Sequence, residues 1–127
     1  MPEGKFPEDD IRFYITQVTL AVQEMHRLSL VHRDVKLQNV MVNEDGYVKL
    51  IDFGLSRLFE HGELMSEAAG TPFYQSVEQH EAQKYDHTVD FWALGILMYE
   101  MRFGNHPFAS GKGGFHPDIE AMKTCTI

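Results

Sequence analysis

Two short segments of the chain concentrate side chains that can do chemistry. The first is HRDVKLQN, from His32 to Asn39, and the second is Asp52 with the phenylalanine and glycine that follow it. A carboxylate can orient an alcohol and accept its proton, and carboxylate and amide oxygens are ligands that Mg²⁺ prefers. Carboxylates, an amine and an amide at such short spacing are the side chains that phosphoryl transfer to an alcohol requires.

The elements around these segments can be predicted from hydrophobic spacing. From Pro7 to about Leu28, apolar residues recur every three or four positions, which predicts a helix with one buried face. Residues 40–42 and 48–51 are apolar runs of strand length, and the sequence Asn-Glu-Asp-Gly at 43–46 is typical of a hairpin turn. The hairpin returns the chain, so we expect Asp52 to lie beside residues 34–39.

The second half of the chain predicts two long loops and a central helix. Residues 55–71 show no sustained period, and residues 104–114 are rich in glycine, proline and polar residues, so both are predicted as loops. Residues 88–101 are apolar on nearly every side and too few to cross a membrane, which predicts a helix buried all round. A further helix is predicted to begin at Asp118 and to extend to Thr124.

Composition excludes several function classes. The 127 residues contain 11 Lys+Arg and 19 Asp+Glu, a net charge of −8, which argues against a protein that grips nucleic acid. The single cysteine excludes an internal disulfide and a multi-cysteine zinc site. The sequence shows neither a membrane-spanning run nor a secretory signal at its start, so we expect no membrane contact and a cytoplasmic location.

The two chemistry-bearing segments resemble motifs of eukaryotic protein kinases. HRDVKLQN is similar to their catalytic loop (32–39) and Asp-Phe-Gly to their DFG motif (52–54), in the family's order. The run TVDFWALGILMYEM is similar to the kinase F-helix (about 88–101), and residues 52–78 then correspond to the activation segment. The resemblance implies a partial kinase domain over 1–127. Its implied fold is a C-lobe, mainly α with a small β hairpin, without the N-lobe and the final helices.

The resemblance also implies roles for single residues. Asp34 corresponds to the catalytic base, Lys36 to a lysine near the transferred phosphate, and Thr71 to a threonine bonded to both. Asn39 and Asp52 correspond to the ligands of Mg²⁺. The implied contacts to ATP are made by Met41, under the adenine, and by Lys36, Asn39 and Asp52.

Other correspondences concern support and substrate. Asp90 is similar to the buried aspartate that braces the catalytic loop, and His32 and Phe53 to members of a hydrophobic column. The segments FPEDDIRFY, YEM with the following Gly-x-x-Pro-Phe, and AMKTCTI resemble cyclic-nucleotide-dependent kinases, the cGMP-dependent ones most. In that family the residue at Glu100 helps bind a basic residue before the target serine or threonine, which implies a protein substrate with basic residues. Gln38 stands where a second acidic contact is usual.

The chain also departs from the family. It contains no Gly-rich loop and no strand lysine with a helix glutamate, so we expect the isolated chain to have little or no activity and to need an N-lobe from a parent chain. The family's Ala-Pro-Glu reads Ser-Val-Glu at 76–78. Where relatives carry an activating phosphothreonine the chain has Glu67, which we expect to pair with Arg33 as a phosphate mimic.

Simpler interpretations stay open beside these. Asp34 could cap a helix, Lys36 could be a solvated charge, and Glu67 could be a solvated loop residue, with Ser66 phosphorylated instead. For the whole chain the alternative is a catalytically inactive kinase fragment or a pseudokinase-like interaction module.

Overall fold

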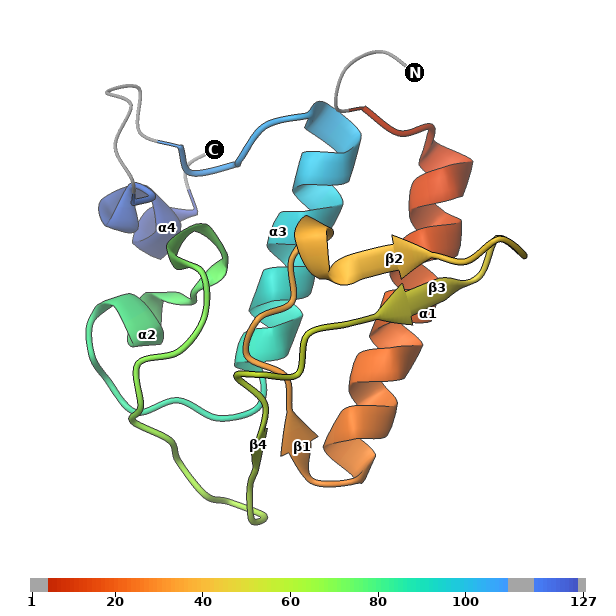
Figure 1. The fold of residues 1–127 in the computed structure, drawn as a ribbon. Helices are drawn as coiled ribbons and strands as arrows, with labels where there is room; N and C mark the ends of the chain where they lie inside the picture. The colour runs from red at the N-terminus through yellow and green to blue at the C-terminus, as the bar shows by residue number, and fades with distance from the viewer. Residues whose placement is uncertain (1–4, 110–115, 126–127) are drawn as a thin grey trace.

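The computed structural model describes residues 5–109 and 116–125. Two long helices lie side by side, a β hairpin covers one of their faces, and two short helices lie on the other side of α3 (Figure 1). The helices are α1 (Glu8–Arg27), α2 (Val77–His80), α3 (Val89–Phe103) and α4 (Ile119–Thr124). The strands are β1 (Leu30–Val31), β2 (Val40–Val42), β3 (Val48–Leu50) and β4 (Arg57–Leu58), and two 3₁₀ turns are η1 (Leu37–Asn39) and η2 (Pro72–Tyr74). The prediction of a mainly α fold with a small β hairpin is confirmed.

Helix α1 forms where the apolar spacing predicted it. Pro7 precedes its first turn, which carries three acidic residues that suit the positive end of the helix dipole. Its buried face consists of Ile11, Val18, Val22 and Met25. This face packs into the same core as the buried side of α3, so the two helices form the frame on which the loops are fixed.

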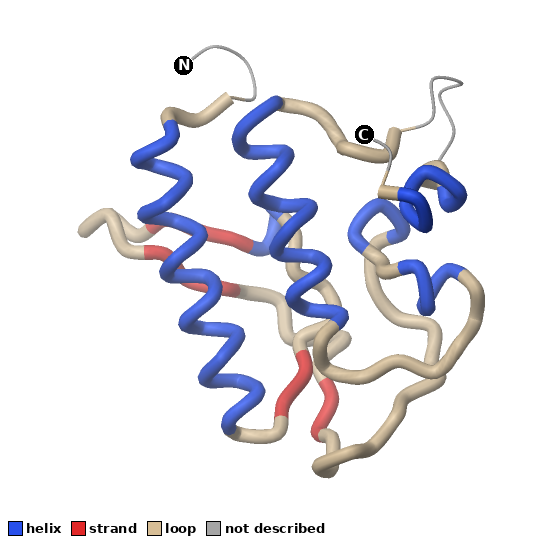
Figure 2. Tube along the Cα trace, turned by 180° about the vertical axis from the view of Figure 1, so that it is seen from behind, coloured by secondary structure: helices blue, strands red, loops and turns tan. Residues whose placement is uncertain are grey.

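The predicted hairpin is present as strands β2 and β3. They pair antiparallel, with Val40 opposite Leu50 and Val42 opposite Val48. Gly46 has φ +86°, a conformation that glycine adopts without cost, and its N–H donates to the Asn43 carbonyl at 2.9 Å. Seen from behind, the hairpin crosses the α1–α3 pair on the far side (Figure 2). The chain therefore leaves β3 close to where it entered β2.

A second small sheet corrects the prediction of a continuous loop over residues 55–71. Strand β4 lies within that range and pairs antiparallel with β1, Leu30 opposite Leu58 and Val31 opposite Arg57. Two residues are too few to show a period of two, so the pairing leaves no signal in the sequence. The pairing ties the start of the segment after Asp52 to the end of α1.

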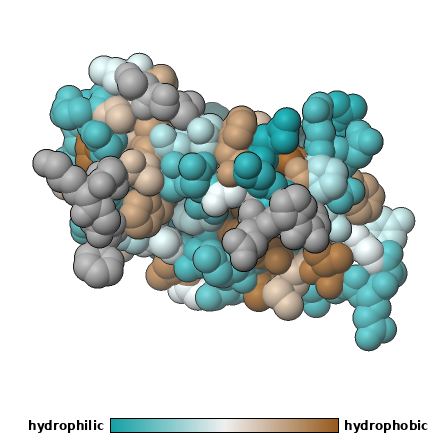
Figure 3. All heavy atoms as spheres, turned by 90° about the horizontal axis from the view of Figure 1, so that it is seen from above, coloured by the Kyte–Doolittle hydropathy of each residue, from teal (hydrophilic) through white to brown (hydrophobic). Residues whose placement is uncertain are grey.

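Helix α3 begins one residue later and ends two residues later than predicted, and the expectation that it is buried all round is wrong. Leu94, Leu97 and Met101 are buried, whereas Phe91 is 41% and Met98 47% exposed. In the view from above, hydrophobic side chains reach the surface between hydrophilic ones (Figure 3). One face of α3 builds the core and another is open in the described chain.

The remaining helices are short. Helix α2 was not predicted, and it begins with a capping box between Ser76 and Gln79. Helix α4 begins as predicted after Asp118, whose side chain accepts the N–H of Ala121. Residues 104–109 of the predicted loop have no regular structure, and residues 110–114 lie outside the described residues. Within the described chain, every helix is too short or too polar to span a bilayer.

Candidate active site

A buried carboxylate fixes the start of the predicted catalytic loop. Asp90, in the first turn of α3, is 1% exposed. Its two oxygens accept the backbone N–H groups of His32 and Arg33, each at 2.9 Å, and the His26 ring lies 2.8 Å from Oδ2. Buried carboxylates are stable only when their oxygens are satisfied in this way. The loop is therefore attached to the core helix through its backbone.

This attachment imposes an unusual backbone conformation. Arg33 has φ +69°, a region that costs a residue with a side chain about 1–2 kcal/mol. Buried His32 stabilises the next step, because its Nδ1 accepts the N–H of Asp34 at 3.1 Å and its Nε2 then donates to the Ile51 carbonyl at 3.1 Å. The turn at 32–34 directs the Asp34 side chain towards Thr71.

The predicted base, lysine and threonine form one hydrogen-bonded chain. The Thr71 hydroxyl donates to Asp34 Oδ1 at 2.8 Å, and the Lys36 ammonium donates to the Thr71 oxygen at 2.9 Å. Lys36 Nζ also lies 3.7 Å from Asp34 Oδ2. Residues 37 positions apart in sequence are thus brought together around a carboxylate that is 8% exposed. A hydroxyl group approaching Asp34 would find its carboxylate already oriented.

Asn39 completes the surroundings of Asp34. Its Nδ2 donates to the Asp34 carbonyl at 2.8 Å and to Oδ2 at 3.3 Å. The Asn39 carbonyl accepts the N–H of Ile51 at 2.9 Å, which connects the loop to the residue before Asp52. No hydrogen bond among the described residues uses the amide oxygen of Asn39, so that oxygen is available to a ligand.

Asp52, the other predicted metal ligand, is held mainly by its backbone. It is exposed, has φ +60°, and its Oδ1 accepts the N–H of Gly54 at 3.2 Å. Positive φ is more accessible to aspartate than to most residues. Phe53 places its ring 5.3 Å from the His32 ring, edge to face, as the resemblance implied.

The donor set fits Mg²⁺. An amide oxygen and an exposed carboxylate are hard oxygen ligands, and Mg²⁺ is commonly held by one or two protein oxygens together with waters and phosphates. The described chain contains no cluster of three or more His, Cys, Asp or Glu side chains of the kind that binds a metal alone. Asn39 and Asp52 would therefore need phosphate oxygens to complete the coordination.

Gly70 allows the segment that carries Thr71 to touch the backbone of residues 32–34. Its φ is +103°, and a Cβ at this position would lie 2.6 Å from the carbonyl oxygen of Arg33. Real Cβ atoms do not approach backbone oxygens so closely. Only glycine lets the next residue, Thr71, reach Asp34.

A groove of about 430 Å³ opens beside Lys36 and Thr71. Glu100, the predicted substrate contact, lines it from α3, and the hydroxyl of Tyr74 donates a short hydrogen bond to the Glu100 carboxylate. Burial raises the pKa of Tyr74, and Glu100 raises it further. The same hydroxyl accepts the N–H of Leu37 at 3.4 Å, so Tyr74 connects Glu100 to the catalytic loop.

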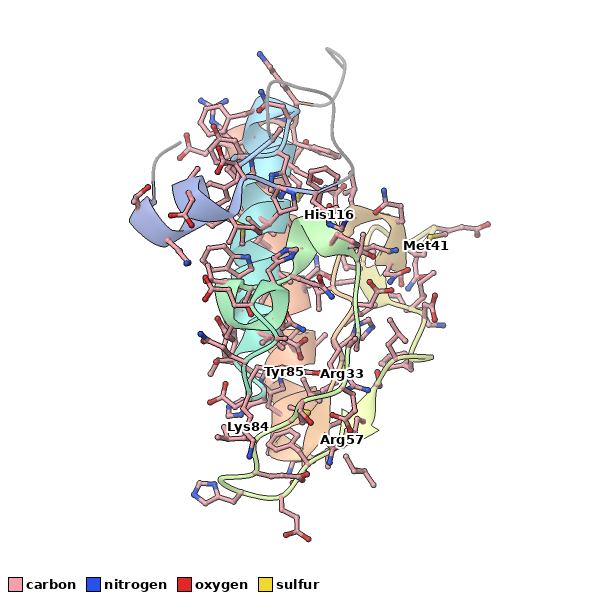
Figure 4. The ribbon with its side chains drawn as sticks, turned by 90° about the vertical axis from the view of Figure 1, so that its left-hand side faces the viewer. Arg33, Met41, Arg57, Lys84, Tyr85 and His116 are labelled. Atoms are coloured by element: carbon pink, nitrogen blue, oxygen red, sulfur yellow. The ribbon has the colours of Figure 1, made fainter. Side chains whose placement is uncertain are left out.

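Met41, the predicted adenine contact, follows Asn39 by two positions. It is on β2 and 50% exposed. In the side view Met41 lies above Arg33, towards the right-hand edge of the molecule (Figure 4). Half of its surface is therefore available for contact with a ligand or another part of a protein.

Glu67 lies beside Arg33 as predicted, and also beside a second arginine. Glu67 Oε2 is 3.7 Å from Arg33, whereas its Oε1 is 3.0 Å from Arg57 on β4. Arg57 also bonds Glu63, and the Tyr85 hydroxyl donates to the Glu67 carbonyl at 2.6 Å. Arg33, Arg57 and Tyr85 lie in the lower half of the side view (Figure 4). Hydrogen bonds to backbone N–H groups, its own first, lower the pKa of Glu67, and both arginines act in the same direction.

Sequence reasoning missed two residues of these clusters, Arg57 and Tyr74. Arg57 is a basic residue followed by glutamates 6 and 10 positions later, a weak signal of an ion pair that depends on how the segment folds back. Tyr74 follows Gly-Thr-Pro-Phe, and nothing in its spacing indicates a bond to Glu100.

Comparison with known proteins connects this geometry to one family. The protein kinase domain family matches residues 1–126. The chain is 42% identical over 107 residues to the RAC-beta serine/threonine-protein kinase of Rattus norvegicus, covering 84% of this chain and 22% of that protein. It is 42% identical over 106 residues to protein kinase C-like 1 of Caenorhabditis elegans, covering 82% of this chain and 15% of that protein.

A third relative extends the same pattern. Identity is 36% over 107 residues to ribosomal protein S6 kinase alpha-1 of Homo sapiens, covering 84% of this chain and 15% of that protein. The chain therefore spans less than a quarter of the length of these three curated relatives.

Proposed function

Because the chain belongs to the protein kinase domain family, we propose that it is the C-lobe portion of a serine/threonine protein kinase, which transfers the terminal phosphoryl group of ATP to a protein serine or threonine. The observation that carries the proposal is the chain of bonds from Lys36 through Thr71 to Asp34, with Asn39 on the other side of the same carboxylate.

The residues divide the work of the reaction. Asp34 orients the substrate hydroxyl and accepts its proton, because its oxygens are fixed by Thr71 and Asn39 before substrate arrives. Lys36 supplies a positive charge beside the transferred group, since it is held within 3.7 Å of Asp34. Asn39 and Asp52 would hold Mg²⁺, which would neutralise charge on the phosphates of bound ATP. Met41 contributes apolar surface under the adenine.

The substrate is a protein segment with a basic residue near its serine or threonine. Support comes from Glu100, a carboxylate lining the groove next to Lys36 and Thr71. Gln38 lines the same groove without a charge, so the described groove offers one acidic contact where two are usual in the family.

The finer resemblance to cGMP-dependent kinases stays a prediction that rests on the three sequence segments that carry it. The three curated relatives are kinases of other names. The cytoplasmic location is likewise a proposal, which imaging of the tagged full-length protein would test.

Magnesium-dependent nucleotide binding tests the proposal directly. We expect ATP titrated into the purified, folded chain in a calorimeter to give weak saturable heat that requires Mg²⁺. Asp52→Asn is the matched control, because asparagine adopts positive φ readily but weakens the metal ligand. A folded chain with no binding, or with equal binding by Asp52→Asn, would contradict the site and favour the inactive interaction module.

Glu67 adds a proposal about regulation. The carboxylate between Arg33 and Arg57 holds the activation segment without a phosphate, delivering one negative charge where a phosphate brings about −1.5 to −2. In the full-length parent, Glu67→Ala should lower turnover, and phosphatase treatment of the unmodified parent should not. Unchanged turnover in Glu67→Ala, or loss of activity after phosphatase treatment, would count against the mimicry and in favour of a phosphorylated residue such as Ser66.

A further inference from the structure

Two histidines hold consecutive carbonyls of the turn η2, which lines the substrate groove. His80 of α2 donates from Nε2 to the Pro72 carbonyl at 2.8 Å. His106, which follows α3, makes a short hydrogen bond from Nε2 to the Phe73 carbonyl. The turn therefore takes its position from two imidazole rings, one on α2 and one in the segment after α3.

The two rings differ in how their second nitrogen is used. His106 Nδ1 accepts the backbone N–H of Phe108 at 3.0 Å, so Nδ1 carries no proton and Nε2 is the donor. No hydrogen bond among the described residues uses Nδ1 of His80, so His80 can take a proton there and keep its bond to Pro72. A proton on His106 Nδ1 would instead face the N–H of Phe108, and one of these two groups would have to move.

His106 is positioned by the end of α3, the helix that also carries Glu100. Helix α3 stops at Gly104, which has φ +78° and donates its N–H to the Glu100 carbonyl at 2.8 Å. Two residues later the half-buried His106 ring packs edge to face on Phe73, with ring centres 5.0 Å apart. The ring thus lines the groove together with Glu100 and Tyr74.

We propose that neutral His106 is a positioning residue of the substrate groove: it fixes the Phe73 carbonyl and thereby Tyr74 and Glu100, so that protonation of the ring weakens binding of a basic peptide. The inference rests on the proposed function, since it takes this groove as the substrate site. Protonation acts twice in the same direction. It disrupts the clamp on η2, and it adds a positive charge beside the carboxylate that binds the basic residue.

The charged groups around the ring support this direction. Glu100 faces it from α3 and Lys36 from the catalytic loop, with the Tyr74 hydroxyl from η2 and His80 from α2 on the other side of that turn. Burial lowers the pKa of His106, although the bond to Phe73 and the charge of Glu100 oppose the effect. The ring is therefore neutral at pH 7, and the clamp is lost only in acid.

The test measures peptide binding by the full chain as a function of pH. A fluorescent serine peptide with arginines before the serine is titrated by anisotropy between about pH 5 and pH 8, beside a peptide with citrulline for arginine. We expect affinity for the arginine peptide to fall by up to about tenfold per pH unit below the pKa of the ring. His106→Asn should lose this dependence, because its side-chain oxygen can accept the N–H of residue 108 at any pH in this range.

Matched variants separate the possible failures. His61→Asn removes an exposed histidine in the turn after β4 and should keep the unmodified pH profile. An unchanged acid loss in His106→Asn would overturn the inference. If the unmodified chain does not distinguish the arginine peptide from the citrulline peptide at about pH 8, the substrate assignment of the groove fails instead.

A second measurement tests the clamp without substrate. NMR of the ring nitrogens should show His106 protonated on Nε2 at neutral pH, and the amide signal of Phe108 should titrate together with the ring. A proton on Nδ1 at neutral pH, or a Phe108 amide that does not follow the ring, would refute the clamp whatever the peptide result.

Discussion

The two carboxylates assigned to phosphoryl transfer, Asp34 and Asp52, have opposite surroundings. Asp34 is buried and accepts hydrogen bonds from Thr71 and Asn39, with Lys36 near. Asp52 is exposed, and among the described residues its carboxylate accepts one bond, from the backbone of Gly54. The half of the site around Asp34, which we propose accepts the proton, is thus built by contacts within the chain. The half around Asp52, which we propose binds the metal, is held mainly by its backbone.

The largest expected effect on stability comes from removing Asp90, which holds the backbone next to Asp34. Asp90→Ala leaves the N–H groups of His32 and Arg33 unsatisfied inside the core, together with His26. We expect a loss of about 3–5 kcal/mol in the free energy of unfolding, measured by urea denaturation. Asp90→Asn keeps one acceptor and should lose less. A loss below about 1 kcal/mol for Asp90→Ala would show that residues 32–39 keep their conformation without the bonds to Asp90.

The next effect tests the bonds around Asp34 themselves. Thr71→Val keeps the shape of the side chain but removes the hydroxyl that joins Asp34 to Lys36. Leaving these groups without a partner should cost about 1–3 kcal/mol in unfolding free energy. Thr71→Ser restores the hydroxyl and serves as the control. Equal stability of the valine and serine variants would mean that the bonds contribute nothing to the fold.

Replacing Asp52 should affect nucleotide binding and leave the stability of the fold almost unchanged. Asp52→Asn should change the unfolding free energy by no more than about 0.5 kcal/mol, because the side chain is exposed and asparagine tolerates its φ of +60°. The same variant should lose magnesium-dependent nucleotide binding. A destabilisation as large as that of Thr71→Val would show that the side chain of Asp52 contributes to the fold as much as the bonds around Asp34 do.

The smallest expected effect lies in the exposed pairs around Glu67. The pKa of Glu67 is lowered below its ordinary value of 4.5, so its contribution to stability is present above that value and is lost as pH falls through the folded-state pKa. Salt should weaken it as well. We expect the unfolding midpoint of Glu67→Gln to match that of the unmodified chain in high salt and to fall below it in low salt at neutral pH. Identical midpoints in both salts would show no net contribution.

Whether a feature of the fold or the site could be predicted depends on how far apart in the sequence the residues that form it are. Helices α1 and α3 and the β2–β3 hairpin follow from local spacing and turn residues, and the motifs at 32–39 and 52–54 identified Asp34, Lys36 and Asn39. The kinase resemblance also supplied Thr71, whose bond to Asp34 spans 37 residues.

What the sequence did not show depends on the tertiary fold. Strand β4 is two residues long and exists through its pairing with β1. Arg57 meets Glu67 because β4 places it there, and His106 reaches Phe73 because α3 ends at Gly104. The open face of α3 is equally invisible to a periodicity argument, since a helix with apolar residues on nearly every side predicts burial and not what covers it.

Gly70 has a consequence for comparing copies of this sequence. A methyl group at position 70 would clash with the Arg33 carbonyl and push away the segment that carries Thr71. Every reactive side chain of the site would remain. A copy of the sequence with alanine at this position would keep every residue of the proposed site, and we expect it to lack the bond between Thr71 and Asp34. Two copies with identical motif residues can therefore differ in the geometry of the site through position 70 alone.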